Sequence, residues 1–173
     1  GEACCTIPNN GRLERYRLKS TDFRRLAAYH YGVAHPVARG ASTPRPGAVS
    51  DQGMREALNG LDAQAFMSEA RETDVRLLRV GDAIMLDLGN PAWSVVRITA
   101  DGWVTEPSAD IGLLRASGMK PLPLRRKPQR GALANLRRLL NVASDTDFRL
   151  AVAWLLSALY PSGPYPVLAV DGE

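Results

Sequence analysis

The sequence predicts an α+β fold, in which small helices and an antiparallel β-meander are followed by a helix and one strand of an α/β module. Three observations predict it. Apolar residues recur at helical spacing in several separate stretches. Between residues 75 and 105, four short runs rich in branched and aromatic residues are separated by tight turns. Finally, Val167–Val170 is a continuous apolar run, as is typical of a strand buried on both faces of a parallel sheet.

A β-hairpin is expected at the N-terminus. Residues Ala3–Pro8 and Leu13–Lys19 read as strands around Pro8-Asn9-Asn10-Gly11, and Asn-Gly favours a tight turn because both residues tolerate positive φ. The second strand alternates residue by residue, so one face should be largely basic and the other mixed. We therefore expect a half-exposed hairpin.

Two helices should follow the hairpin, separated by a loop at 32–49 that is rich in glycine and proline. Ser20 can cap a helix over 21–31, and Ser50 or Asp51 can cap a second helix that ends near Met67. The second helix has an apolar stripe of Met54, Leu58, Leu61 and Ala65.

The meander and a linker come next. The expected strands are 75–80, 83–88, 93–99 and 103–105, and turn residues separate them. The stretch 111–131 is proline-rich and the most basic part of the chain, so it reads as a linker. We expect an accessory module over 1–114, a basic linker over 115–131 and the start of a second module over 132–173.

The second module should begin with a short amphipathic helix at 132–140. Asp145 is a good cap for the next helix, and Pro161 with Gly163 stops it. One apolar face of this helix follows the i, i+3, i+4 spacing: Phe148, Ala151, Val152, Leu155, Leu156 and Leu159.

Composition excludes several classes of protein. The 173 residues carry 22 Lys+Arg against 18 Asp+Glu, a charge of +4 that permits nucleic-acid binding without demanding it. No apolar run approaches the roughly 20 residues of a membrane span, and no secretory signal is visible. Cys4 and Cys5 are adjacent, so a disulfide between them could not link distant segments of the chain. We therefore expect reduced cysteines in a cytoplasmic protein. We also expect no membrane partner.

Searching for catalytic and metal-binding residues yields none. The chain has no G-x-S-x-G elbow and no H-E-x-x-H helix. Asp82, Asp87 and Asp101 lie at or beside the turns of the meander, where aspartate is favoured for local hydrogen bonds. We interpret them as turn residues rather than metal ligands.

Residues 167–173 combine an apolar run with a glycine that follows it. Val167–Val170 is followed by Asp171-Gly172-Glu173, and a buried strand that runs into glycine is how a phosphate-binding loop begins. Gly172 would then be the first glycine of G-x-x-x-x-G-K-[ST]. The second glycine, the lysine and the hydroxyl residue do not occur after it within the 173 residues, so we expect a fragment of a longer polypeptide.

A family resemblance agrees with this pattern. Residues 136–173 (LRRLLNVASDTDFRLAVAWLLSALYPSGPYPVLAVDGE) resemble the approach to the Walker A loop in bacterial and phage ATPases of mobile elements. These are primase–helicase-like proteins whose P-loop module is related to superfamily 3 and AAA+ helicases. Three upstream phrases, Ile84–Gly89, Val96–Trp103 and Gly118–Pro123, are similar to that family's accessory region. The resemblance covers most of the chain in short phrases.

The resemblance implies a fragment of an ATP-binding, DNA-associated protein that acts in replication or transfer of a mobile element. It implies ATP and Mg²⁺ as cofactors of the full-length parent and none for this chain, which alone should be inactive. The remainder of the ATPase domain would be its partner, and the parent could form a homo-oligomer. The alternative is a non-enzymatic module that binds nucleic acid or another protein.

Basic residues are the candidates for contact with DNA, because each neutralised phosphate releases counterions and guanidinium groups bind phosphate well. Nothing resembles a base-reading helix, so such binding should be electrostatic. The candidates lie on the hairpin, on the helix after it and in the linker: Arg15, Arg17, Lys19, Arg24, Arg25, Arg125, Arg126, Lys127 and Arg130.

Overall fold

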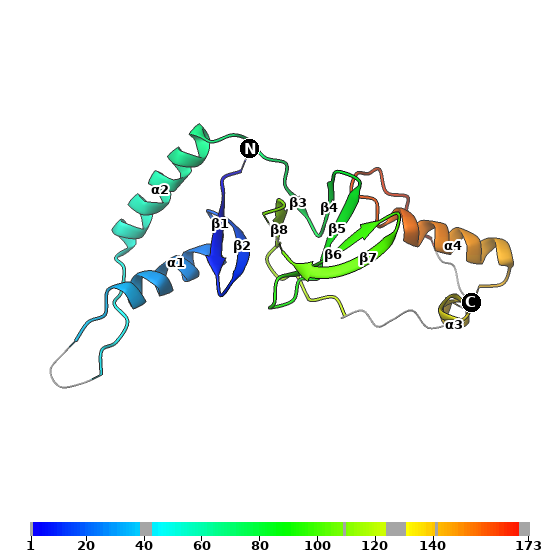
Figure 1. The fold of residues 1–173 in the computed structure, drawn as a ribbon, viewed down its shortest axis with the longest axis horizontal. Helices are drawn as coiled ribbons and strands as arrows, with labels where there is room; N and C mark the ends of the chain where they lie inside the picture. The colour runs from blue at the N-terminus through cyan, green and yellow to red at the C-terminus, as the bar shows by residue number, and fades with distance from the viewer. Residues whose placement is uncertain (1, 39–42, 109, 124–130, 141, 170–173) are drawn as a thin grey trace. The chain divides into compact units, whose positions relative to one another are not determined.

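The computed structural model describes residues 2–38, 43–108, 110–123, 131–140 and 142–169 (Figure 1). The described residues form a mixed α+β structure, which confirms the coarse fold prediction. The chain divides into two compact units, Gly1–Asp74 with Ser108–Ser117 and Val75–Pro107 with Gly118–Glu173. These boundaries differ from the expected division at 114 and 131, because residues 108–117 return to the first unit.

The first unit begins with the predicted hairpin. Strands β1 (Cys4–Asn9) and β2 (Arg12–Arg17) are antiparallel. Between them Asn10 and Gly11 have φ angles of 49° and 77°, so both residues adopt the left-handed conformation that the Asn-Gly pair predicts.

Both predicted helix starts are confirmed. Helix α1 (Thr21–Ala34) begins after Ser20, whose Oγ accepts a hydrogen bond from the Phe23 amide at 3.1 Å. It runs three residues beyond the expected end at Tyr31. Helix α2 (Asp51–Met67) begins after Ser50, whose Oγ accepts from the Gly53 amide at 3.0 Å.

A short strand completes the first unit. Strand β8 (Leu113–Leu114) pairs with β3 (Asp74–Val75), and the Asp74 amide donates to the Gly112 carbonyl at 3.2 Å. Both leucines are buried in a strand, so the interpretation of 111–131 as a linker is wrong at Leu113 and Leu114. The apolar core of the unit is made of Leu18, Phe23, Met54, Leu113 and Leu114.

The second unit contains the predicted meander. Its strands are β4 (Leu77–Val80), β5 (Ala83–Asp87), β6 (Ser94–Thr99) and β7 (Gly102–Pro107). They form one sheet in sequence order with every pair antiparallel. The buried apolar residues of this region are Leu78, Met85, Leu88, Trp93, Val95 and Val96.

Turn hydrogen bonds fix the end of β5. The buried Asp87 accepts from the Gly89 amide through Oδ1 at 2.8 Å, which is the local role expected for this aspartate. Gly89 has φ 63°, and a Cβ there would lie 3.1 Å from the Lys120 carbonyl oxygen. Arg76 donates to that same carbonyl at 3.0 Å and to the Asp87 carbonyl at 3.3 Å. These contacts hold residues 118–122 against the meander.

Two helices follow. Helix α3 (Ala132–Leu140) has the predicted bounds. Helix α4 (Asp145–Ser157) begins one residue earlier than expected, because Ser144 rather than Asp145 is the cap: its Oγ accepts from the Asp147 amide at 3.1 Å. Arg137 of α3 pairs with Asp145 and lies over the ring of Phe148 at 5.5 Å, which joins the two helices.

The strand predicted at Val167–Val170 is not formed by its described residues. Val167 to Ala169 have no strand pairing, and Val167 is 93% exposed. A strand requires a neighbour to complete its hydrogen bonds, and the described residues offer none at this place. Instead Trp154 of α4 donates through Nε1 to the Pro166 carbonyl at 2.6 Å. Of the expected helix and strand, only the helix is therefore present.

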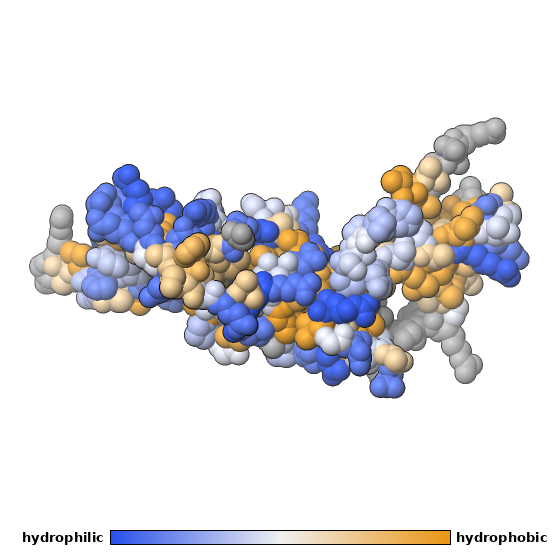
Figure 2. Space-filling view, turned by 90° about the horizontal axis from the view of Figure 1, so that it is seen from above, coloured by the Kyte–Doolittle hydropathy of each residue, from blue (hydrophilic) through white to orange (hydrophobic). Residues whose placement is uncertain are grey.

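Helix α4 is also only partly covered. Of its predicted apolar face, Ala151 is buried, whereas Leu155, Leu156 and Leu159 are exposed. Figure 2 shows apolar surface over the end of the chain that holds α3 and α4. Within the described ranges, every helix is too short or too polar to span a bilayer.

Candidate functional site

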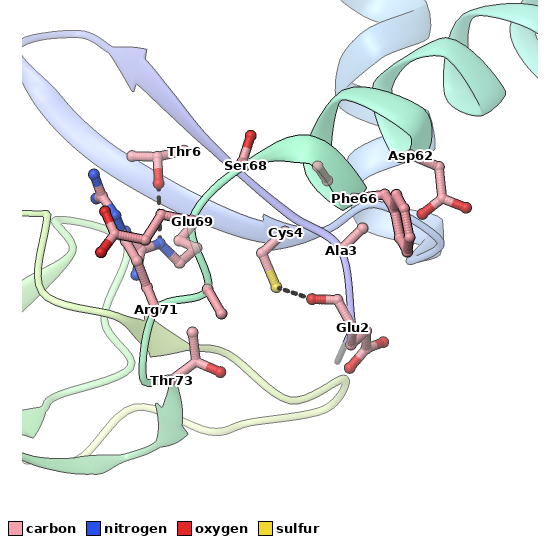
Figure 3. Close-up of a pocket in the computed structure, with 13 residues that line it drawn as sticks. Glu2, Ala3, Cys4, Thr6, Asp62, Phe66, Ser68, Glu69, Arg71 and Thr73 are labelled. Atoms are coloured by element: carbon pink, nitrogen blue, oxygen red, sulfur yellow. Dashed lines mark hydrogen bonds between the residues drawn. The ribbon is translucent and has the colours of Figure 1, made fainter.

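A pocket of about 620 Å³ lies within the first unit (Figure 3). One wall is the N-terminal hairpin, with Glu2, Ala3, Cys4 and Thr6 before and along β1 and Arg15 on β2. The other wall is the last two turns of α2 and the residues between Ser68 and Thr73. Such a volume is in the usual range for small-molecule sites.

Strand register places Arg15 in this wall. Thr6 and Arg15 are direct cross-strand partners, so their side chains project from the same face of the hairpin. Arg15 donates from Nε to Thr6 Oγ1 at 2.9 Å. Arg15 is only 8% exposed, so within the half-exposed hairpin this basic residue is buried.

Asp110 neutralises part of this charge. Its Oδ1 accepts from Arg15 Nη2 and, at 3.4 Å, from Thr6 Oγ1, while its Oδ2 accepts from Arg71 Nη1 at 2.6 Å. Burial lowers the pKa of Arg15, and the nearby charge of Arg71 lowers it further. Two guanidinium groups therefore share one carboxylate at this side of the pocket.

Glu14 forms a second polar cluster in the hairpin. Its buried carboxylate accepts from Arg12 Nε and from the Tyr16 hydroxyl, both at 2.7 Å. Burial by itself would raise the pKa of Glu14, but hydrogen bonds from Tyr16, Arg12 and Asn9 outweigh it and the pKa is lowered. Burial and the bond to Glu14 raise the pKa of Tyr16.

The other predicted cations of this unit each lie beside a carboxylate. Arg17 pairs with Glu2 at 2.8 Å, and Lys19 pairs with Asp62 at 3.3 Å. The two arginines of α1 do the same at 3.1 and 3.9 Å: Arg24 with Asp51 and Arg25 with Asp22. These pairs reduce the positive charge that the hairpin and α1 present to a phosphate. Contact with nucleic acid at these residues stays a prediction.

The remaining predicted site residues lie outside the described residues. They are Arg125, Arg126, Lys127 and Arg130 of the basic linker and Gly172 of the expected phosphate-binding loop. Their role in binding DNA or ATP also stays a prediction.

Both cysteines lie in β1 and are free thiols. Cys4 lines the pocket and its Sγ donates to the Glu2 carbonyl at 3.6 Å. Burial raises the pKa of both thiols, so each is protonated at neutral pH. Across the described part of the chain, no three His, Cys, Asp or Glu side chains are placed to hold a metal ion.

No known protein family, curated protein or solved structure matches the chain. Its function is therefore inferred from its own residues and from the resemblance of residues 136–173.

Sequence reasoning missed the pocket and the two residues that complete it, Asp110 and Arg71. Asp110 lies 95 residues from Arg15 along the chain, and no local pattern marks such a contact. The one available signal was the position of Arg15, because a charged residue in the middle of a strand of a small hairpin is a candidate for burial with a partner.

We predict that Glu14→Gln destabilises the first unit by roughly 1–2 kcal/mol near neutral pH, because it removes charge-assisted hydrogen bonds. A carboxyl with a lowered pKa stabilises the fold above its unfolded pKa, near the reference value of 4.5, and this contribution is lost as pH falls through the folded pKa. The effect should therefore shrink as the pH falls below 4.5 and through the lowered pKa of the folded state. Urea unfolding, followed by the amide NMR signals of β1 and β2 at about pH 7 and pH 3, measures it.

The matched control is Glu72→Gln, since Glu72 is an exposed carboxylate of the same unit. It should change stability by less than about 0.5 kcal/mol. If Glu14→Gln destabilises the unit equally at both pH values, the ionised carboxylate of Glu14 is not the source of the stabilisation.

Proposed function

We propose that this chain is the accessory region and the first helices of a P-loop ATPase of a mobile element, and that the parent protein associates with DNA. The observation that carries the proposal is the resemblance of residues 136–173 to the segment that precedes a Walker A loop. The parent would bind ATP with Mg²⁺.

The geometry of α4 supports this proposal. The half of its apolar face that lies toward the C-terminal end is exposed, with Leu156 at 65%. Burying a leucine side chain contributes roughly 1.5–3 kcal/mol, so several exposed leucines on one helix favour a further folded element against it. The remainder of an ATPase domain is such an element. The extended residues Val167–Ala169 would form a strand once neighbouring strands are present.

The next part of the reading frame tests this proposal first. Translation beyond Glu173 should give a second glycine followed by Lys-Ser or Lys-Thr, because the loop needs the lysine for the phosphates and the hydroxyl for Mg²⁺. A frame that lacks the lysine would remove the proposal.

The matching biochemical expectation is that the 173-residue chain hydrolyses no ATP, because phosphoryl transfer needs the P-loop lysine, the hydroxyl and a Walker B acid together. The measurement is phosphate release by purified protein, compared with a preparation from cells that lack the gene. Turnover above that background, abolished by a substitution within residues 1–173, would contradict it.

We propose that the basic linker makes most of the contacts between the parent protein and DNA. The described cations of the hairpin and α1 are paired with carboxylates, and breaking such a pair opposes the gain from phosphate contact. The linker residues Arg125, Arg126, Lys127 and Arg130 lie in the most basic stretch of the sequence, which makes them the better candidates. Binding through them would be salt-sensitive and would discriminate little between sequences.

We predict that Arg125→Ala, Arg126→Ala and Arg130→Ala together lower the slope of log K against log salt by roughly 2 to 3 units. The matched control is Arg17→Ala, Lys19→Ala and Arg24→Ala together, which removes the same formal charge but should lower the slope by less than about 1 unit. Fluorescence anisotropy with labelled single- and double-stranded DNA across a salt series measures both. If the control triple variant changes the slope as much as the linker variant, the hairpin and α1 carry the contact instead.

A further inference from the structure

The buried guanidinium of Arg15 has unused hydrogen-bonding capacity that faces the pocket. Its Nε donates to Thr6 and its Nη2 to Asp110, whereas Nη1 has no acceptor among the described residues. No buried side-chain nitrogen or oxygen among the described residues lacks a partner, so Nη1 is open to solvent. Since Arg15 is almost completely buried and lines the pocket, that solvent is the pocket interior. A fixed pair of N–H donors therefore points into the cavity.

Arg71 adds donors at the mouth of the same pocket. It donates from Nη1 to Asp110 at 2.6 Å, and its Nε and Nη2 have no acceptor among the described residues. Figure 3 places Arg71 on the same side of the pocket as Thr6, on the segment that follows α2. Two guanidinium groups thus converge on one carboxylate, and each keeps nitrogens that have no acceptor among the described residues.

Away from the two arginines, the pocket is lined by apolar and acidic residues. Ala3, Ala65 and Ala70 contribute apolar surface, and the ring of Phe66 is 88% exposed beside it. Two of the acidic side chains of the pocket are already neutralised, Glu2 by Arg17 and Asp62 by Lys19. In Figure 3, Phe66 and Asp62 lie on the side away from Arg71. The pocket therefore has guanidinium donors at one side and the ring of Phe66 at the other.

We propose that this pocket binds a small organic carboxylate, whose carboxylate accepts hydrogen bonds from Arg15 Nη1 and Arg71 and whose apolar body packs against Ala65 and Phe66. A guanidinium fork matches the planar geometry of a carboxylate. Glu69, a further acidic residue of the lining, disfavours a dianion such as phosphate. Burial and the nearby Arg71 lower the pKa of Arg15, and a bound carboxylate would oppose this shift.

This inference does not depend on the proposed ATPase function, because every residue that it uses belongs to the first unit. If phenylacetate does not bind, the ATPase proposal is unaffected, and if the reading frame lacks the P-loop lysine, the proposal of a carboxylate site is unaffected.

Phenylacetate is a suitable probe, because it combines a carboxylate with an aromatic ring that can stack on Phe66. Titration into the ¹⁵N-labelled 173-residue protein, followed by the amide signals of residues 68–73, should give saturable binding at one site. Phenylacetamide has the same shape without the charge and should bind at least about tenfold more weakly. Inorganic phosphate should bind more weakly than phenylacetate.

Three variants locate the site. Arg71→Gln, at an exposed residue, should weaken phenylacetate binding about tenfold, whereas Asp110→Asn should strengthen it several-fold because it removes the internal competitor for the guanidinium groups. Arg24→Gln, at an ion pair of the same unit outside the pocket, should leave binding unchanged. Chemical shifts outside the substituted site confirm that each variant is folded.

The proposal is overturned if phenylacetate shows no saturable binding, if phenylacetamide binds equally well, or if Arg71→Gln has no more effect than Arg24→Gln. Tighter binding of inorganic phosphate would overturn the carboxylate assignment and identify a phosphate site instead.

Discussion

The first unit depends on the contact between Arg15 and Asp110. Removing a guanidinium from water costs several kcal/mol unless a carboxylate and further acceptors replace the lost hydration. Arg15 is buried, and its carboxylate partner Asp110 comes from residues 108–117. The hairpin and residues 108–117 therefore stabilise each other. Strand β8, close to Asp110 in the sequence, also supplies the buried Leu113 and Leu114 of the same core. This explains why a unit made of two distant stretches of sequence is compact.

The ion pairs also distinguish two groups of arginines: those whose charge is paired with a carboxylate, and those that keep donors for a ligand. In the hairpin and α1, carboxylates lie within 4 Å of the cations at Arg15, Arg17, Lys19, Arg24 and Arg25, so these residues contribute to the architecture of the unit. Arg15 and Arg71 share one carboxylate, that of Asp110, and keep guanidinium nitrogens that have no acceptor among the described residues. The proposals for DNA and for a small carboxylate follow from this difference: the linker is assigned to phosphate contact, and the pocket is assigned to an organic anion.

Much of the fold could be predicted from the sequence where its cause is local. Ser20 and Ser50 cap the helices that they were expected to cap, Asn10-Gly11 forms the hairpin turn, and the meander has the expected order. Features that depend on distant residues could not be predicted. The two residues of β8 have no periodicity of their own, and the partner of Arg15 is remote in sequence. The apolar run Val167–Val170 predicted a strand, but its described residues Val167–Ala169 lack a neighbour to pair with.

A double-mutant cycle on Arg15 and Asp110 tests the central claim most directly. The free energy of unfolding of the first unit would be measured in urea for the wild type, Arg15→Gln, Asp110→Asn and the double variant. The account predicts a coupling energy of roughly 1–2 kcal/mol, reduced from that of a fully buried pair because the Asp110 side chain is 40% exposed. Additive effects, with a coupling below about 0.3 kcal/mol, would show that the hairpin and residues 108–117 are held together by something other than this ion pair.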